Sequence, residues 1–196
     1  MASVRNTGHA DRFLDAARDV ILTVGWKRAT LTDVARRAEV SRTTVYRSYP
    51  DMQTILADLM TREWIGLIDQ VADDVADEGQ SLPDLIALRV SRSVAGLRES
   101  PLFRRISEVD PEQLVPYLID RRGRTQDAIV EVMAGRIAEA QAADEVRQGR
   151  PVVLARTLVL ALHGFALSIQ TMVDDEVSQA DIDAELTAMV KRYLAP

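Results

Sequence analysis

Hydrophobic side chains recur every three or four residues along most of the chain, a pattern that predicts helices rather than strands. The first helix is expected over residues 10–24, with Gly25 as its stop. Its apolar face consists of Phe13, Ala16, Ala17, Val20, Ile21 and Val24. Beyond residue 50, further helices are expected over 51–77, 82–97, 102–109, 112–119, 120–143, 152–173 and 181–194. We therefore expect an all-α protein of about nine helices.

Two short helices separated by a turn are predicted over residues 30–50. Thr30 and Asp33 have the spacing of a capping box, so the first of these helices is expected to begin at Leu31. After a break at residues 39–40, Ser41 is well placed to cap the second helix. This arrangement is a helix-turn-helix, although two short helices with a turn also occur in many all-α proteins that do not bind DNA.

The second of these helices carries side chains suited to a DNA groove. Val45 is its inward anchor, and no acidic residue occurs from residue 40 to 49. The side chains expected to face outward are Arg42, Thr43, Thr44, Tyr46 and Arg47. Arginine pairs with guanine edges, threonine offers a methyl and a hydroxyl group, and tyrosine donates to phosphate oxygens. The helix-turn-helix is therefore predicted to bind DNA.

The stretch from Phe13 to Leu59 resembles the DNA-binding domain of TetR-family transcriptional regulators. The similarity rests on Gly25-Trp26, Thr30-Leu31-x-Asp33-Val34-Ala35, Ala38-x-Val40-Ser41, Thr44-Val45-Tyr46-x-x-Tyr49 and Pro50-Asp51. The resemblance implies a three-helix DNA-binding domain over residues 1–50 and a linking helix over 51–77. It also implies that residues 51–196 form a larger helical domain that dimerises and often binds a small effector.

Three positions depart from the family pattern. Glu39 stands in the turn where the family usually has glycine, so the turn lacks the residue that adopts left-handed backbone most easily. Met52 stands where the family usually has a lysine aimed at a phosphate, and Ser48 stands where an aromatic residue or histidine is frequent. We expect weaker or more salt-sensitive phosphate contacts than is usual in the family.

Each residue of the predicted DNA interface has an expected role. Arg42 and Thr43 are expected to contact base edges, and Arg47 to contact either a base or a phosphate. Phosphate contacts are expected from Thr32, Thr44, Tyr46 and Tyr49, with a weaker one from Ser48.

The charge distribution agrees with a DNA-binding N-terminus. Residues 1–50 hold nine Lys/Arg against five Asp/Glu, a net of +4, whereas residues 51–196 hold 15 against 25, a net of −10. The two halves sum to the formal charge of −6. A basic front on an acidic body is expected when one end of a protein meets phosphate and the other does not.

Composition bears on whether the protein has a metal site, a cofactor, a signal peptide or a membrane span. The chain has no cysteine and only two histidines, His9 and His163, far apart in sequence, so we expect no metal site and no cofactor. The first twelve residues are polar and lack the apolar core of a signal peptide, which predicts a cytoplasmic protein. Residues 152–173 are long enough for a membrane span, but Arg156, His163 and Gln170 form a polar stripe, so a buried soluble helix is expected.

The C-terminal part is expected to hold an effector pocket and a dimer interface. Prolines 101, 111 and 116 divide it into short helices, which pack less regularly than long ones. The candidate pocket residues for a mostly apolar effector are Leu97, Phe103, Ile106, Tyr117, Met133, His163, Phe165 and Met172. The candidate interface residues, on the last two helices, are Ala161, Gly164, Ser168, Leu186, Met189 and Val190. Ordinary core packing is the alternative for both sets.

These observations predict a homodimeric, sequence-specific regulator, most simply a repressor released from a palindromic operator by a small effector. A ligand-independent regulator controlled by a partner protein remains open. An architectural DNA-coating protein is disfavoured by the acidic body. An enzyme is also disfavoured, because the C-terminal part offers no nucleophile–base pair, metal set or phosphate-binding glycine loop.

Overall fold

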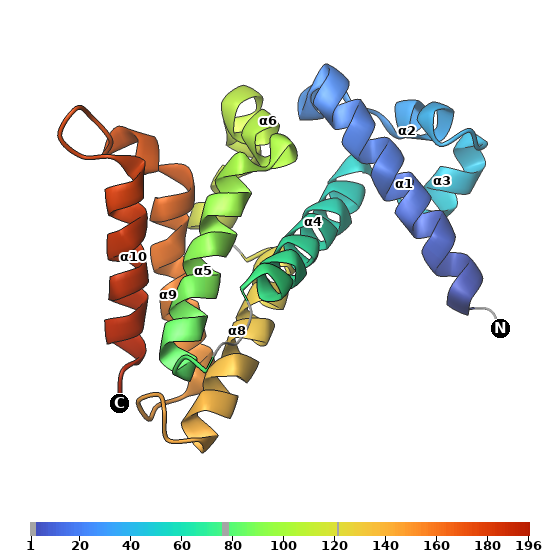
Figure 1. The fold of residues 1–196 in the computed structure, drawn as a ribbon. Helices are drawn as coiled ribbons and strands as arrows, with labels where there is room; N and C mark the ends of the chain where they lie inside the picture. Colours follow the sequence, from blue (N-terminus) through green and yellow to red (C-terminus); the bar gives the residue numbers. More distant parts are fainter. Residues whose placement is uncertain (1–2, 76–78, 121) are drawn as a thin grey trace. The chain divides into compact units, whose positions relative to one another are not determined.

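The computed structural model describes residues 3–75, 79–120 and 122–196, together with their side chains except those of 3–9 and 117. These residues form helices and contain no β-strand, which confirms the predicted all-α class (Figure 1). The α-helices are α1 (Ser3–Val24), α2 (Leu31–Arg37), α3 (Arg42–Ser48), α4 (Met52–Asp74), α5 (Leu82–Glu99), α6 (Pro101–Val109), α7 (Val115–Ile119), α8 (Arg124–Ala142), α9 (Pro151–Leu167) and α10 (Gln179–Leu194). The described residues also form the 3-10 helices η1 (Trp26–Arg28), η2 (Pro111–Gln113) and η3 (Ile169–Thr171).

The chain divides into two compact units, each made of segments that are distant in sequence. The first unit contains residues 1–63 and 100–125, and the second contains residues 64–99 and 126–196. This division differs from a boundary at residue 50, because half of α4 and the whole of α6 and α7 belong with the helix-turn-helix. The assignment of residues 51–196 to regulation and dimerisation stays a prediction.

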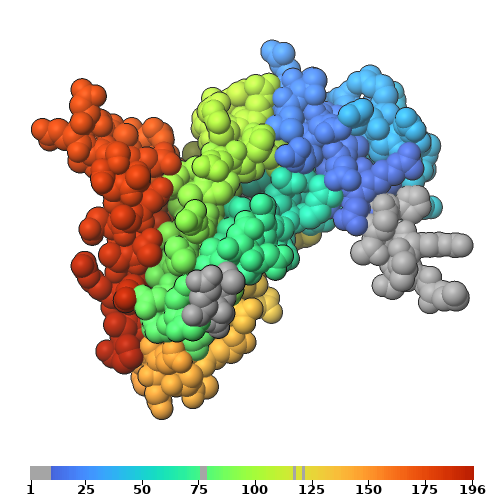
Figure 2. Space-filling model, in the orientation of Figure 1, coloured from blue at the N-terminus to red at the C-terminus, as the bar shows by residue number. Residues whose placement is uncertain are grey.

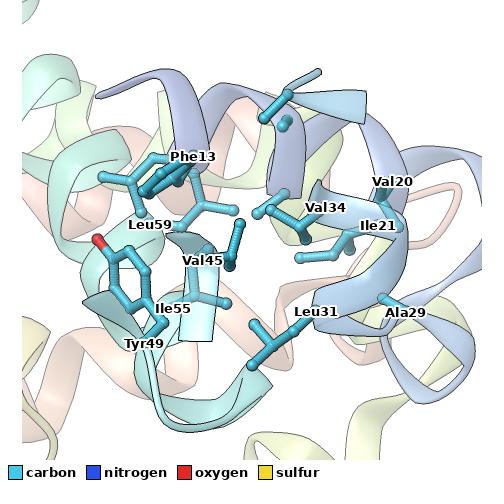
Figure 3. Close-up of a cluster of buried hydrophobic side chains, with 14 of the residues drawn as sticks. Phe13, Val20, Ile21, Ala29, Leu31, Val34, Val45, Tyr49, Ile55 and Leu59 are labelled. Carbon is cyan, nitrogen blue, oxygen red and sulfur yellow. The ribbon is translucent and has the colours of Figure 1, made fainter. Parts of the chain in front are cut away.

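The first unit is built around one apolar core (Figure 3). Val34 from α2 and Val45 from α3 are completely buried in it, which confirms their predicted inward positions. Leu102 and Ile106 from α6 are buried in the same core. Since these two side chains come from beyond residue 99, the helix-turn-helix depends on a segment that is far from it in sequence.

Side-chain caps fix the starts of α2 and α3. The Thr30 hydroxyl accepts a hydrogen bond from the Asp33 backbone N–H at 3.2 Å, as the capping-box spacing predicts. The Ser41 hydroxyl accepts from the Thr44 N–H, also at 3.2 Å. Each cap satisfies a backbone donor that the helix itself leaves unpaired, so both helices begin where the sequence predicts.

The turn between α2 and α3 is a left-handed helix end made without glycine. Glu39 adopts φ +54°, and its N–H donates to the Arg36 carbonyl at 3.2 Å. The Val40 N–H donates to the Ala35 carbonyl at 3.0 Å. These two bonds form a Schellman motif, which satisfies the last carbonyls of α2. Glu39 therefore takes the conformation usual for glycine and bears the steric cost of its Cβ.

The second unit has its own apolar core. α10 lies along α5, and α5 also packs against α9 (Figures 1 and 2). Leu158 of α9 and Leu186 and Val190 of α10 are buried in this core. The Arg98 guanidinium donates to both carboxylate oxygens of Asp183 at 2.6 and 2.7 Å and to the Phe165 carbonyl at 3.1 Å. One largely buried arginine thus connects α5, α9 and α10.

Some predicted helix limits need correction. α1 begins at Ser3 rather than at Ala10, and Val24 at its C-terminal end is exposed rather than on the buried face. α9 ends at Leu167, because Ser168 leaves the helical conformation and the chain continues as η3. No helix in the described ranges has the length and apolar character needed to cross a membrane.

Replacing Glu39 with glycine is expected to stabilise the first unit. Glycine adopts φ +54° without a Cβ clash, so Glu39→Gly should raise the free energy of unfolding by roughly 0.5–1 kcal/mol. Chemical denaturation measures the difference. Glu39→Ala is the control, because it also removes the exposed 3.9 Å contact with Arg12 but keeps the Cβ. Equal stabilities for the glycine and alanine variants would contradict the strain argument.

Candidate nucleic-acid interface

One buried side chain orients α3 so that its opposite face is exposed to solvent. Val45 has no exposed surface, whereas Tyr46 beside it is 53% exposed. Arg42, Thr43 and Arg47 are exposed as well. Since these side chains stand on one short capped helix, they form one polar, positively charged surface, as the sequence predicts. We call Arg42, Thr43, Tyr46 and Arg47 the reading face.

The arginines of the helix-turn-helix fall into two groups. Arg36 of α2 pairs with Asp33 at 2.6 Å. Arg37 donates to Asp19 of α1 at 2.9 Å. Arg42 and Arg47 of α3 form no ion pair with any residue that the structure describes. The reading face thus keeps its positive charge for an external anion, whereas the charge of α2 is neutralised within the protein.

The remaining predicted contacts lie around the reading face. Thr32 is half-buried in the first turn of α2, and Ser48 is exposed at the end of α3. Thr44 is half-buried, and its hydroxyl oxygen lies 2.7 Å from that of Ser41. All three remain candidate phosphate contacts.

Tyr49 requires a correction. Its side chain is only 5% exposed and meets the Phe13 ring edge-on, with 6.4 Å between ring centroids (Figure 3). Burial and the nearby Asp58 carboxylate, which accepts a hydrogen bond from the hydroxyl, raise the pKa of Tyr49 to about 12. The aromatic ring belongs to the core, and the hydroxyl already has an anionic acceptor. The prediction of a phosphate contact is therefore wrong.

The start of α4 explains the departure at Met52. Met52 packs against the core of the first unit. Asp51 accepts a hydrogen bond from the Thr54 N–H at 2.7 Å, and this bond holds the pKa of the Asp51 carboxyl below its ordinary value. The position usually held by lysine is thus occupied by a packing residue that supplies no charge.

Asp110 is a buried residue that the sequence interpretation missed. It is 3% exposed, and its Oδ2 accepts a hydrogen bond from the Trp26 N–H at 2.9 Å. A Cβ at Gly25 would lie 3.3 Å from the same oxygen, and Gly25 has φ +84°. The two residues are 84 positions apart, so no local pattern indicates the contact. It fixes η1, which leads into α2, to the end of α6.

The candidate pocket residues are divided between the units. Leu97, Met133, His163 and Phe165 belong to the second unit, and Met133 and Phe165 pack against its core. Phe103 and Ile106 belong to the first unit, where Ile106 is part of the core, and Met172 is 67% exposed. Ile106 thus fills a core and Met172 lies largely in solvent, because helical spacing does not identify which surface a side chain enters. The effector pocket itself stays a prediction. Tyr117 lies outside the residues whose side chains the structure describes.

His163 is the polar member of this group with a defined partner. Its Nε2 lies 3.2 Å from the Gln126 Nε2. Burial lowers the pKa of His163, so the ring is neutral at pH 7 and Nε2 accepts from the amide. Among the side chains described, no group of three or more His, Asp or Glu residues is arranged to hold a metal ion.

The candidate interface residues differ in solvent exposure. Ala161, Gly164, Ser168 and Met189 are exposed and remain available to a partner. Leu186 and Val190 are completely buried within the second unit, so their assignment to an interface is wrong. An apolar stripe on a helix is equally compatible with packing inside a subunit and between subunits, and here α5 covers it.

Comparison with known proteins identifies the family. The sequence profile for "Bacterial regulatory proteins, tetR family" matches residues 13–59. An uncharacterized HTH-type transcriptional regulator of Mycobacterium tuberculosis H37Rv is 31% identical over 183 residues, covering 93% of each chain. The chain belongs to the TetR family. It is a transcriptional regulator with a helix-turn-helix at its N-terminus.

Two solved structures share the fold of this chain. The R. erythropolis transcriptional repressor QsdR, from the TetR family, superposes with a TM-score of 0.71 at 15% identity, covering 95% of this chain and 96% of its own. RolR, solved with the ligand resorcinol, has a TM-score of 0.68 at 13% identity, covering 99% of this chain and 90% of its own. At these identities the likeness concerns the fold alone.

Acidification is expected to destabilise this TetR-family protein through His163. Its pKa in the folded protein lies below 6.5, so stability is full above pH 6.5 and is lost as the pH falls toward the folded pKa. Denaturation of the wild type and His163→Gln between roughly pH 7.5 and 5 isolates this contribution, since the carboxyl groups are common to both. The variant should lose less stability over this range. The same pH dependence in both proteins would disprove the role of His163.

Proposed function

We propose that the protein is a homodimeric repressor that places α3 in the DNA major groove at each half of a palindromic operator. The reading face supports this proposal most directly. It presents two arginines without ion-pair partners among the described residues, and its helix is fixed by the Ser41 cap and the Val45 anchor. A regulator of this kind works beside the chromosome, which agrees with the expected cytoplasmic location.

The roles of the individual side chains follow from their positions. Arg42 and Thr43, in the first turn of α3, would contact base edges, because the N-terminal residues of a recognition helix enter the groove most deeply. Tyr46 would donate to a phosphate and Arg47 would contact a base or a phosphate. The half-buried Thr32 and Thr44 and the exposed Ser48 would complete the backbone contacts.

The exposed side of α9 supports the proposed dimer. Leu160 is 70% exposed and Val153 is exposed on the same helix seven residues earlier. Ala161 and Gly164 lie beside Leu160, and a Cβ added at Gly164 would meet no atom within 4 Å. Small and apolar side chains on one face let a second helix approach closely. Met189 supplies a further exposed apolar group on α10.

The proposed effector would bind in the second unit near His163. RolR, with the same fold, was solved with resorcinol, which supports a small and mostly apolar ligand for this chain. Met133 and Phe165 supply apolar surface, and the Gln126–His163 pair supplies polar groups. Binding there would shift the population of DNA-competent dimers.

Selection of bound sequences from a random duplex pool at about physiological salt tests the proposed function, because non-specific phosphate binding is weak there. A palindromic sequence should be enriched, with half-sites about one helical turn apart or slightly more. Failure of the folded protein to enrich any sequence would overturn the proposal. An enriched sequence without two-fold symmetry would overturn the dimeric arrangement.

Arg42→Ala is expected to relax sequence preference at one position of each half-site, at a cost of about 1–3 kcal/mol on the selected duplex. Affinity for random duplex should fall far less. Arg36→Ala is the matched control, since Arg36 already pairs with Asp33. Fluorescence anisotropy with both duplexes measures the difference. Equal losses on the two duplexes for Arg42→Ala would show that Arg42 does not contact bases.

Leu160→Glu is expected to convert the dimer to a monomer without unfolding the protomer, because the side chain is exposed within one subunit. Sedimentation equilibrium measures the mass, and circular dichroism verifies the fold. Ile119→Glu is the control, since Ile119 on α7 is similarly exposed at 76%. A Leu160→Glu protein that remains dimeric would contradict the proposed interface.

A further inference from the structure

Most basic side chains around the helix-turn-helix are neutralised within the protein. Residues 10–63, all of which the structure describes, contain nine Lys and Arg side chains. Six of them pair with carboxylates, namely Arg12, Arg18, Lys27, Arg36, Arg37 and Arg62. The other three are Arg42 and Arg47 of the reading face and Arg28 of η1, whose side chains form no ion pair or hydrogen bond with any described residue. Arg28 is the one member of this unpaired set that lies outside the reading face.

Two buried anchors hold the Arg28 side chain at the surface. Trp26 is 9% exposed and Ala29 is 8% exposed, and both belong to the core of the first unit, whereas Lys27 and Arg28 between them are exposed. Consecutive residues of a 3-10 helix point roughly 120° apart, so Arg28 leaves η1 in a different direction from Lys27. The Lys27 ammonium lies 3.4 Å from the Glu112 carboxylate. Arg28 does not share this carboxylate and keeps its full charge.

The backbone of η1 is fixed at both ends. The Trp26 N–H donates to the buried Asp110 carboxylate at 2.9 Å, and the Ala29 N–H donates to the Trp26 carbonyl at 3.1 Å. Thr30, the next residue, caps α2. Arg28 therefore stands two residues before the capped start of α2, and its side chain, rather than its backbone, is what must be ordered when it binds an anion.

The start of α2 is a position at which a helix-turn-helix approaches the DNA backbone. In this motif the second helix lies in the major groove and the first helix crosses the sugar-phosphate backbone. At the other end of α2, Arg36 and Arg37 are already paired with carboxylates. Met52 supplies no charge, and the Tyr49 hydroxyl already has an anionic acceptor. Among these positions, Arg28 is the one with a positive charge left for a phosphate.

From this distribution of charge we propose that Arg28 of η1 contacts a DNA phosphate beside each half-site, separately from the reading face. The inference rests on the proposed function, to which it adds a contact that depends on charge and not on base sequence. An arginine that neutralises a phosphate releases condensed counterions, which makes binding depend on salt concentration. Because phosphates carry no direct sequence information, the contact stabilises complexes with every duplex to a similar extent.

The salt dependence of DNA binding tests the inference. Arg28→Gln removes one phosphate contact from each protomer, so the slope of log K against log salt concentration should become less steep by roughly 2 for the dimer. The Kd should rise on the order of tenfold at about physiological salt on the selected duplex, and by a similar factor on random duplex at lower salt. Arg28→Lys retains the charge and should keep the wild-type slope. Fluorescence anisotropy measures the slopes, and circular dichroism verifies the fold.

Lys27→Gln is the matched control, since it removes the same charge from the neighbouring position, where Glu112 already neutralises it. Its slope should stay close to that of the wild type. An unchanged slope for Arg28→Gln, or an equal change for Lys27→Gln, would overturn the inference. A loss of affinity confined to the selected duplex would also overturn it, because Arg28 would then contact bases. If the selection yields no duplex, the proposed function fails, and the slopes on random duplex still decide whether Arg28 contacts phosphate.

Discussion

The hydrogen bond from the Trp26 N–H to the Asp110 carboxylate is the contact on which the DNA-binding unit depends most. A buried carboxylate is costly without a partner, so Asp110 and the backbone of η1 hold each other in place. Leu102 and Ile106 bury their side chains in the same unit. As a result, the unit that presents α3 is completed by α6, a helix outside the helix-turn-helix sequence.

Within this unit, some arginines form ion pairs that hold the helices together, and others remain available to bind DNA. Ion pairs between α1 and α4 join Arg18 to Glu63 and Arg62 to Asp15. The arginines of α2 are likewise paired with carboxylates, and the exposed arginines of α3 are not, among the residues described. Internal pairs orient the helices, and the charge available to DNA is concentrated on one helix. The number of positive charges that can contact phosphate is therefore smaller than the number of Lys and Arg side chains in residues 1–50 suggests.

The sequence predicts well those features that are determined locally. The caps at Thr30 and Ser41 and the inward position of Val45 depend on neighbours within four residues, and all are confirmed. Tyr49 and Leu186 were misassigned, because helical spacing shows that a side chain faces an apolar surface but not which one. Asp110 was missed because its partner, Trp26, is 84 positions away, and a single aspartate forms no recognisable sequence motif.

The discontinuous first unit has a consequence for how the protein is made. Because chains emerge from the ribosome N-terminus first, residues 1–63 are complete well before residues 100–125 are synthesised. Until α6 arrives, the surface that Leu102 and Ile106 cover stays open and the Trp26 N–H lacks Asp110. A nascent or prematurely terminated chain therefore has no finished DNA-binding unit, and it would not occupy operators ahead of the complete regulator.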